Sequence, residues 1–339
     1  MIQSSNKTSA LLVIIAFAIV YVVWGSTYFF IQMAIHGFPP MLMGAFRYFT
    51  AGILMLIWCR IKGDKLWVWK DIKTSAVCGL LMLFVATGVV IWVERTLPSA
   101  MVAIMVSANP VWFVILDKAN WKINLKNRST IAGIILGFSG VLLLFGEAIE
   151  RSLNGSLGQA QLIGLFLLIL SPIAWSAGSL YSKKNAVNAP ARLNVAWQMI
   201  IAGLAFIPAS ALHNEYSTFH FSQVPAQAWF ALVYLILFGS IAAFSAYVWL
   251  LGVRPATQVS THSYVNPVIA VLLGMGFNNE HITILQIFGL LVILVSVLLV
   301  NLSKYGPAFK NRISSIWVSI KGLNPFAKKD KMADVCCQS

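Results

Sequence analysis

Long apolar runs follow one another along almost the whole chain, and only short polar segments separate them. Each run holds about 18 to 24 residues, which is enough for a helix to cross roughly 30 Å of hydrocarbon. The pattern predicts an all-α polytopic membrane protein with ten transmembrane helices, at residues 10–32, 40–59, 73–93, 98–116, 129–146, 160–181, 193–212, 227–250, 256–276 and 282–303.

Composition supports this class. Of the 339 residues, 59% are hydrophobic and 10% are charged, whereas about a quarter of the residues in soluble domains are charged. This excludes soluble enzymes and secreted disulfide scaffolds. Two of the four cysteines, Cys59 and Cys78, lie in apolar runs, and Cys336 and Cys337 lie in the tail. Their spacing fits neither a metal site nor a disulfide framework, so we expect no metal and no cofactor.

The net charge of +14 is explained by topology. With both termini in the cytoplasm, the inner segments carry 21 Lys and Arg residues and the outer segments carry two, Arg95 and Arg151. The positive-inside rule therefore predicts a multi-pass protein with cytoplasmic N- and C-termini. Because the cations are dispersed among loops, they do not form the continuous basic surface that a nucleic-acid partner requires.

The chain contains an internal duplication. Asn109-Pro110-Val111 recurs as Asn266-Pro267-Val268, 157 residues later. A spacing of 151 residues relates Trp24 to Trp175, Arg47 to Gln198, and Ala51-Gly52 to Ala202-Gly203. Each copy holds five spans, an odd number, so the copies should be inverted in the membrane, as in many alternating-access carriers. The plainer alternative is that duplication only supplied more helices.

The predicted domains follow from this duplication. They are an N-terminal cytoplasmic segment 1–9, a first five-helix repeat 10–148, a second five-helix repeat 160–303, and a basic cytoplasmic tail 304–339. Apolar residues at helical spacing predict an amphipathic helix over residues 308–323 of the tail. The last four residues, Cys336 to Ser339, formally fit a prenylation box, although Gln338 is a poor aliphatic substitute.

The sequence resembles the EamA family of the drug/metabolite transporter superfamily, and within it the inner-membrane carriers. The resemblance covers about 290 residues and both copies, and it rests on the segments 24–29, 39–40, 46–52, 237–240 and 264–274 and on Glu280. It implies a ten-helix carrier of the bacterial inner (plasma) membrane with two EamA repeats around a central cavity, which moves small organic solutes, usually outward. Gln32 departs from the family pattern, which often has Lys or Arg at the end of the first span.

Asn109 and Asn266 are candidates for a solute cavity, because each lies near the bilayer midplane and precedes a proline. Proline disfavours helix at the preceding residue, so both helices should kink there and leave carbonyls open to a cavity. An amide beside free carbonyls can bind a polar solute. Alternatively, each Asn only repairs the interrupted helix or bonds to a neighbouring one.

Aromatic residues supply further candidates. Trp24 and Tyr28 lie on one stripe of the first span, and Trp175 is the counterpart of Trp24. Their rings could stack on a solute, although an interfacial position is the common alternative for Tyr28. His262 shares a helical face with Asn266, as a neutral hydrogen-bonding group or as a proton carrier. Tyr264, off that face, completes the predicted cavity.

Arg47 is the only formal charge well inside a predicted span. A charge at that depth is costly unless it is paired or hydrated. We favour a structural pair with Glu94, at the outer end of the third span, over an anion-facing vestibule.

Together these features predict a secondary transporter, and not an enzyme, that exports small organic metabolites, amino-acid-like or drug-like solutes, by alternating access. Its partners are then a small-molecule solute and the lipid bilayer, and both a monomer and a homodimer are compatible with the sequence. A membrane-embedded enzyme and a non-transporting membrane sensor are the alternatives.

Overall fold

The computed structural model describes residues 10–121, 128–154, 158–185, 189–254, 256–277, 283–296 and 298–299. Every element in these ranges is helical. The termini, which include the predicted amphipathic helix and the terminal cysteines, lie outside the described residues, as does Glu280.

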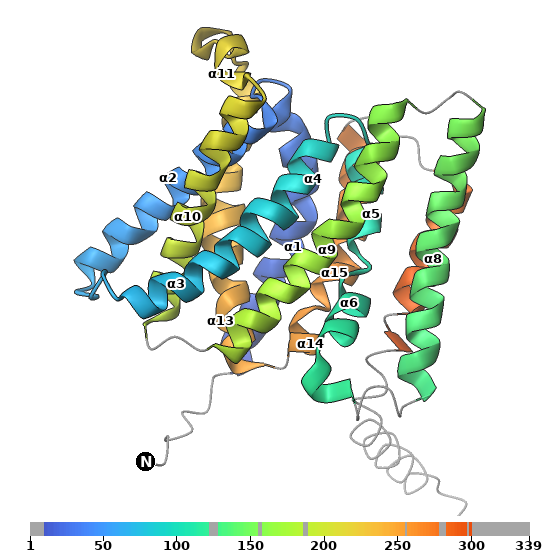
Figure 1. The fold of residues 1–339 in the computed structure, drawn as a ribbon, viewed down its shortest axis with the longest axis horizontal. Helices are drawn as coiled ribbons and strands as arrows, with labels where there is room; N and C mark the ends of the chain where they lie inside the picture. The colour runs from blue at the N-terminus through green and yellow to red at the C-terminus, as the bar shows by residue number, and fades with distance from the viewer. Residues whose placement is uncertain are drawn as a thin grey trace, which may run out of the picture.

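In the first half the elements are α1 (Ala10–Ile35), α2 (Pro40–Ile61), α3 (Trp69–Cys78), the π-helical segment η1 (Gly79–Ala86), α4 (Thr87–Val93), α5 (Ser99–Val106), α6 (Asn109–Leu116), the short 3-10 turn η2 (Lys118–Asn120) and α8 (Arg128–Leu153). In the second half they are α9 (Gln159–Lys184), α10 (Ala191–Leu212), α11 (Glu215–Thr218), η3 (Phe221–Gln223), α12 (Ala226–Tyr234), the π-helical segment η4 (Leu235–Phe244), α13 (Ser245–Val253), α14 (Ala256–Val259) and α15 (His262–Phe277). The long helices run between one end of the bundle near α11 and the other near α14 (Figure 1).

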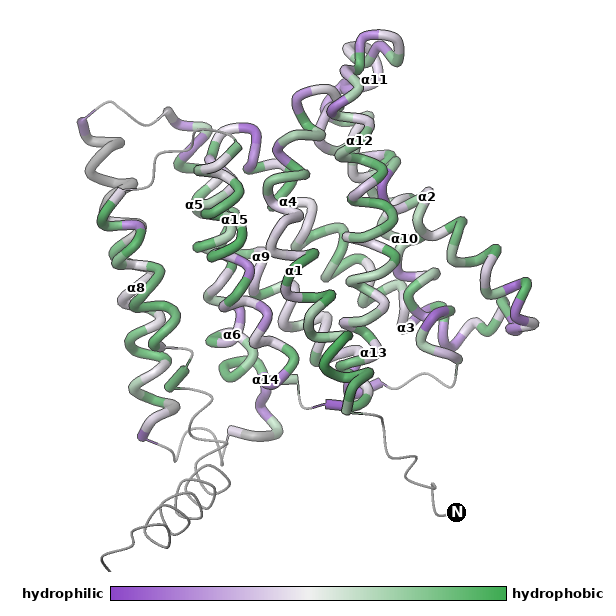
Figure 2. Tube along the Cα trace, turned by 180° about the vertical axis from the view of Figure 1, so that it is seen from behind, coloured by the Kyte–Doolittle hydropathy of each residue, from purple (hydrophilic) through white to green (hydrophobic). Residues whose placement is uncertain are grey.

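Seven stretches of the described chain are long and apolar enough to cross a membrane: Ala10–Ile35, Pro40–Ile61, Trp69–Val93, Ser99–Leu116, Gln159–Lys184, Ala191–Leu212 and Ala226–Val253. They coincide with seven of the ten predicted spans. Shorter apolar helices, Ile131–Gly140, His262–Phe277 and Ile284–Ser296, fall where the other three were predicted. Hydrophobic residues dominate the helices, and polar residues gather toward their ends and connections (Figure 2). This distribution is that of a polytopic membrane protein.

The helices α2 and α10 cross at a pair of equivalent glycines. A Cβ added to Gly52 would stand 2.8 Å from the backbone N of Ile200, and one added to Gly203 would stand 2.6 Å from the backbone N of Phe49. Only glycine permits so close an approach of two backbones. The repeated Ala-Gly pair of the sequence therefore holds the two halves of the chain against each other.

The segments η1 and η4 are also equivalent. A shift of 157 residues, the same that relates the two Asn-Pro motifs, places η1 on residues 236–243, inside η4. π-Helical turns are rare and occur mostly at functional sites. Both segments contribute residues to the cavity described below.

At the two ends of the bundle, polar contacts hold the connections in place. Glu215 of α11 accepts hydrogen bonds from the backbone N–H groups of Met41 and Leu42, at 3.2 and 2.8 Å, and so caps the start of α2. Between α2 and α3, Asp64 accepts two hydrogen bonds from Arg192, at 2.6 and 2.7 Å. These hydrogen bonds hold the pKa of Asp64 below its ordinary value.

Candidate solute cavity

A cavity lies in the middle of the bundle, where both halves of the chain meet. Its walls come from α1, α2, η1, α4, α5 and α6 of the first half and from α9, η4 and α15 of the second. The space open to the centres of water molecules is about 80 Å³. Because one water needs roughly 10–15 Å³ of such space, this conformation has room for a compact solute of roughly five to eight non-hydrogen atoms.

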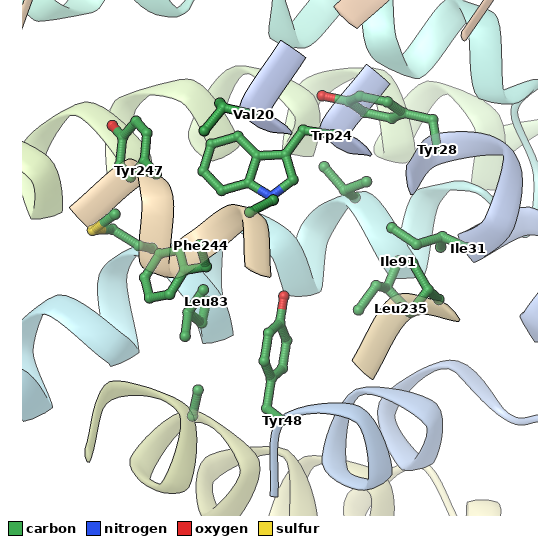
Figure 3. Packing of buried hydrophobic residues seen from close by; sticks show 14 of the residues in the cluster. Val20, Trp24, Tyr28, Ile31, Tyr48, Leu83, Ile91, Leu235, Phe244 and Tyr247 are labelled. Carbon is green, nitrogen blue, oxygen red and sulfur yellow. The ribbon is translucent and has the colours of Figure 1, made fainter. Parts of the chain in front are cut away.

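The indole of Trp24 is central to an aromatic cluster in this wall. Its Nε1 donates to the backbone carbonyl of Gly239 at 3.1 Å. Its ring centroid lies 5.2 Å from that of Trp175, 4.9 Å from Tyr247 and 5.0 Å from His262. Figure 3 shows Trp24 among Tyr28, Phe244 and Tyr247, with the hydroxyl of Tyr48 directed toward this group. The two tryptophans that the duplication equates are thus in direct contact.

A second hydrogen bond extends the aromatic cluster toward α13. Trp175 Nε1 donates to Tyr247 Oη at 2.9 Å, and Ser179 Oγ lies 2.8 Å from the same hydroxyl. Tyr247 is completely buried. The sequence analysis did not identify Tyr247, because nothing in its local pattern reveals that α13 packs against α9.

His262 and Asn266 form one polar region of the cavity lining, which we call one end. Both side chains are buried, and Asn266 Nδ2 lies 3.2 Å from His262 Nδ1. With the amide in this orientation its nitrogen donates to Nδ1, so a neutral imidazole carries its proton on Nε2. Two buried atoms, His262 Nε2 and Asn266 Oδ1, then have no hydrogen-bond partner. Unpartnered buried polar groups are rare in folded proteins and therefore informative.

The two Asn-Pro motifs differ in their helices. In the first half the chain is interrupted at Ser107 and Ala108, and Asn109 begins α6. In the second half the interruption falls earlier, at residues 260–261, and Asn266-Pro267 lies inside α15. The interruption of the second span therefore lies before Asn266, and the expected kink at that residue is displaced toward the start of the span.

Asn109 is more fully bonded than its counterpart. Ser176 Oγ lies 3.2 Å from both the backbone oxygen and the side-chain oxygen of Asn109, to which it donates. Asn109 still lines the cavity. Asn109 therefore both lines the cavity and joins α6 to α9.

Arg47 forms a second polar region of the lining, which we call the other end. It is 4% exposed, lines the cavity, and donates from Nε to Ser240 Oγ at 2.9 Å. Its Nη1 is buried without a hydrogen-bond partner. A Cβ on Gly239 would stand 3.1 Å from Arg47 Nη2, so glycine at this position leaves room for the guanidinium group.

Glu94 is buried at the end of α4, and its charge acts on both Arg47 and Tyr28. The predicted structural pair between Arg47 and Glu94 remains a prediction, because the hydrogen bond observed for Arg47 is to Ser240.

Of the predicted cavity residues, the cavity brings together Trp24, Tyr28, Asn109, Trp175, His262 and Asn266. Tyr264 lies apart from this lining and packs, partly buried, against the hydrophobic core. Tyr48, Ser171, Ser240 and Phe244 line the cavity without having been singled out. Tyr48 and Ser240 do lie in the segments that carried the family resemblance, which is the signal that could have found them.

Comparison with known proteins agrees with this architecture. The model of the EamA-like transporter family matches twice, at residues 11–146 and 162–302. The chain belongs to the EamA-like transporter family. It is a multi-pass membrane transporter, and the two matches cover its two halves.

Individual relatives agree with the family. The chain is 34% identical over 290 residues to the uncharacterized inner membrane transporter YedA of Escherichia coli K12, covering 84% of this chain and 89% of that protein. It is 24% identical to the uncharacterized transporter YoaV of Bacillus subtilis (81% and 91% covered) and 24% identical to a probable amino-acid metabolite efflux pump of E. coli K12 (82% and 91% covered). A solved crystal structure shares the fold, with a TM-score of 0.60 and 17% identity over 87% of this chain and 98% of its own.

Proposed function

We propose that this EamA-like transporter is a secondary carrier that exports small organic metabolites, amino-acid-like or drug-like solutes, by alternating access. The observation that carries the proposal is the cavity itself: a mostly apolar space with a few buried polar atoms that have no hydrogen-bond partner, and with walls from both copies of the repeat. Sites at the interface of two repeats near the bilayer midplane are typical of secondary transporters.

In this proposal ten helices form two inverted five-helix repeats, and the short apolar helices complete the count. The N- and C-termini lie in the cytoplasm, so the end of the bundle near α14 faces inward and the end near α11 faces outward. Arg95, one of two cations expected outside, lies beside the outer vestibule formed with Trp92 and His213.

Solute counterflow tests the proposal. Purified full-length protein is reconstituted into vesicles preloaded with an unlabelled mixture of amino acids and organic acids, and entry of the labelled mixture is followed. We expect exchange well above that of protein-free vesicles. Ala86→Phe should abolish exchange because Ala86 lines the cavity, while Ala18→Phe, on a lipid-facing position, should leave it intact.

Equal entry in wild-type and protein-free vesicles, or full exchange by Ala86→Phe, contradicts the carrier proposal. A second measurement with and without a pH gradient addresses coupling. Of the described carboxylates, Glu94 is the one whose charge acts within the cavity region, and we expect weak or absent dependence on the gradient.

A further inference from the structure

The two ends of the central cavity differ in chemistry, and that difference specifies a solute. One end presents Arg47 Nη1, a cationic donor that is buried and without a partner. The guanidinium is held in position by Ser240, which accepts from Nε at 2.9 Å. Arginine stays protonated in proteins and matches the geometry of a carboxylate. An anionic group is therefore the complement of this end.

The other end presents one donor and one acceptor. His262 Nε2–H and Asn266 Oδ1 are both buried and unpartnered, while the remaining polar atoms of the pair face each other at 3.2 Å. A hydroxyl group can donate to Asn266 Oδ1 and accept from His262 Nε2–H. Neither side chain carries a negative charge, so this end offers nothing to compensate an ammonium group.

The indole of Trp24 connects the two ends. Its Nε1 bonds to the carbonyl of Gly239, the residue beside Arg47, and the same ring packs edge-on against His262 with centroids 5.0 Å apart. A short apolar body lying on this indole would place one polar group near Arg47 and another near His262. The free volume limits that body to a few carbon atoms.

On the basis of the proposed carrier function, we propose that the solute is a small organic anion, a monocarboxylate that carries a hydroxyl group on its short carbon chain. Its carboxylate binds Arg47 Nη1, its hydroxyl bridges His262 and Asn266, and its carbon chain lies on Trp24. Glu94, whose charge acts on Arg47, is not among the lining residues. The site therefore selects a hydroxy acid over an amino acid of equal size.

Four matched probes test this assignment: 3-hydroxybutyrate, its neutral methyl ester, butyrate without the hydroxyl, and zwitterionic 3-aminobutyrate. Binding to the purified full-length protein is measured by titration calorimetry. We expect 3-hydroxybutyrate to bind at least ~10-fold more tightly than the ester, because a charge-assisted hydrogen bond is lost, and about 5-fold more tightly than butyrate, because a neutral one is lost.

Variants locate the effect. Arg47→Gln introduces the residue found at the equivalent position 198. In this variant the acid and the ester should bind with about equal affinity. Asn266→Ala should remove the preference for 3-hydroxybutyrate over butyrate and leave the preference over the ester. Arg95→Gln is the matched control, since Arg95 stacks on Trp92 outside this cavity, and it should change neither ratio. If Arg47→Gln does not fold, the relative affinities of the wild-type protein for the four probes still test the assignment.

Equal binding of acid and ester, tighter binding of 3-aminobutyrate, or binding of none of the four probes overturns the assignment. Counterflow of the metabolite mixture separates this failure from failure of the carrier function. If the mixture still exchanges while 3-hydroxybutyrate does not bind, the solute class is wrong and the carrier stands. If no component of the mixture exchanges, the carrier proposal itself fails.

Discussion

The two repeats share their backbone features and differ in their side-chain chemistry. Equivalent glycines cross in α2 and α10, and equivalent spans contain the π-helical segments η1 and η4. Yet Arg47 reaches across to Ser240, whereas its counterpart Gln198 bonds to Asn194 on its own helix at 2.8 Å. Likewise Asn109 is bonded to Ser176, and Asn266 retains an unpartnered oxygen.

The comparison teaches that duplication supplied a symmetric frame and that a few substitutions made its centre asymmetric. The charged donor comes from the first repeat, and the histidine and the unpartnered amide oxygen come from the second. A site with different chemistry at its two ends can orient a solute, which a strictly symmetric site could not do.

The glycine crossing should give the largest effect. Replacing Gly52 or Gly203 by Leu forces a side chain into the backbone of the partner helix, and overpacking of this kind costs about 3 kcal/mol or more. We expect either variant to lose most of the monodisperse protein in size-exclusion chromatography. Gly252→Leu is the control, because a Cβ there meets open space. Normal yields for both crossing variants would refute the shared frame.

Charge reversal tests the predicted pair between Arg47 and Glu94. Arg47→Glu and Glu94→Arg should each lower the yield of folded protein sharply, because each puts two like charges in the bundle interior. The double variant should recover that yield if the pair is structural. Recovery is measured by the same chromatography, and failure of the double variant to recover removes the pairing.

The two asparagines should separate transport from stability. Asn266→Ala removes a cavity acceptor and the donor to His262 Nδ1, so it should lower the initial counterflow rate about 10-fold and also lower the melting temperature. Asn109→Ala breaks the connection to Ser176 and should lower the melting temperature with little loss of counterflow. Both quantities are measured on the same reconstituted preparations. If Asn109→Ala lowered the counterflow rate and Asn266→Ala did not, the roles assigned to the two residues would be wrong.

Replacing the two tryptophans by phenylalanine should change the stability by smaller amounts. Trp24→Phe leaves the carbonyl of Gly239 without the indole donor and should lower the free energy of unfolding by about 1 kcal/mol. Trp175→Phe should cost less, because Tyr247 keeps its contact with Ser179. Apparent melting temperatures in detergent measure the difference. A larger loss in Trp175→Phe would reverse this ranking.

The ion pair between Asp64 and Arg192, at the end of the bundle, should have the smallest effect on stability. Since Arg192 lowers the pKa of Asp64, ordinarily 3.8, the pair stabilises the fold fully at pH above that value and is lost as pH falls through the lowered pKa. Wild type should therefore melt slightly above Asp64→Asn at pH 7, and the gap should close in acid and narrow in high salt. A gap independent of pH and salt would exclude this ion pair as its source.

Much of the frame was predictable from the sequence. Apolar runs located the spans, and the 151-residue repeat equated the two tryptophans that lie 5.2 Å apart. The spacing of four residues predicted that His262 and Asn266 share a face, and their side chains are in contact. The pairing of Arg47 with Ser240 and of Trp175 with Tyr247 could not be predicted, because it depends on how distant helices pack. The same holds for η1 and η4, whose apolar sequences carry no local signal for the wider turn.

The π-helical segments have a mechanical consequence. A π turn accommodates one more residue than an α turn, so each of the two spans holds a surplus residue in its wall at the level of the cavity. If the π turn of one span became α-helical with all its residues kept, the helix beyond it would rotate by about 100°. Side chains now directed into the cavity would then turn into the neighbouring helices, while the remainder of the bundle could keep its packing.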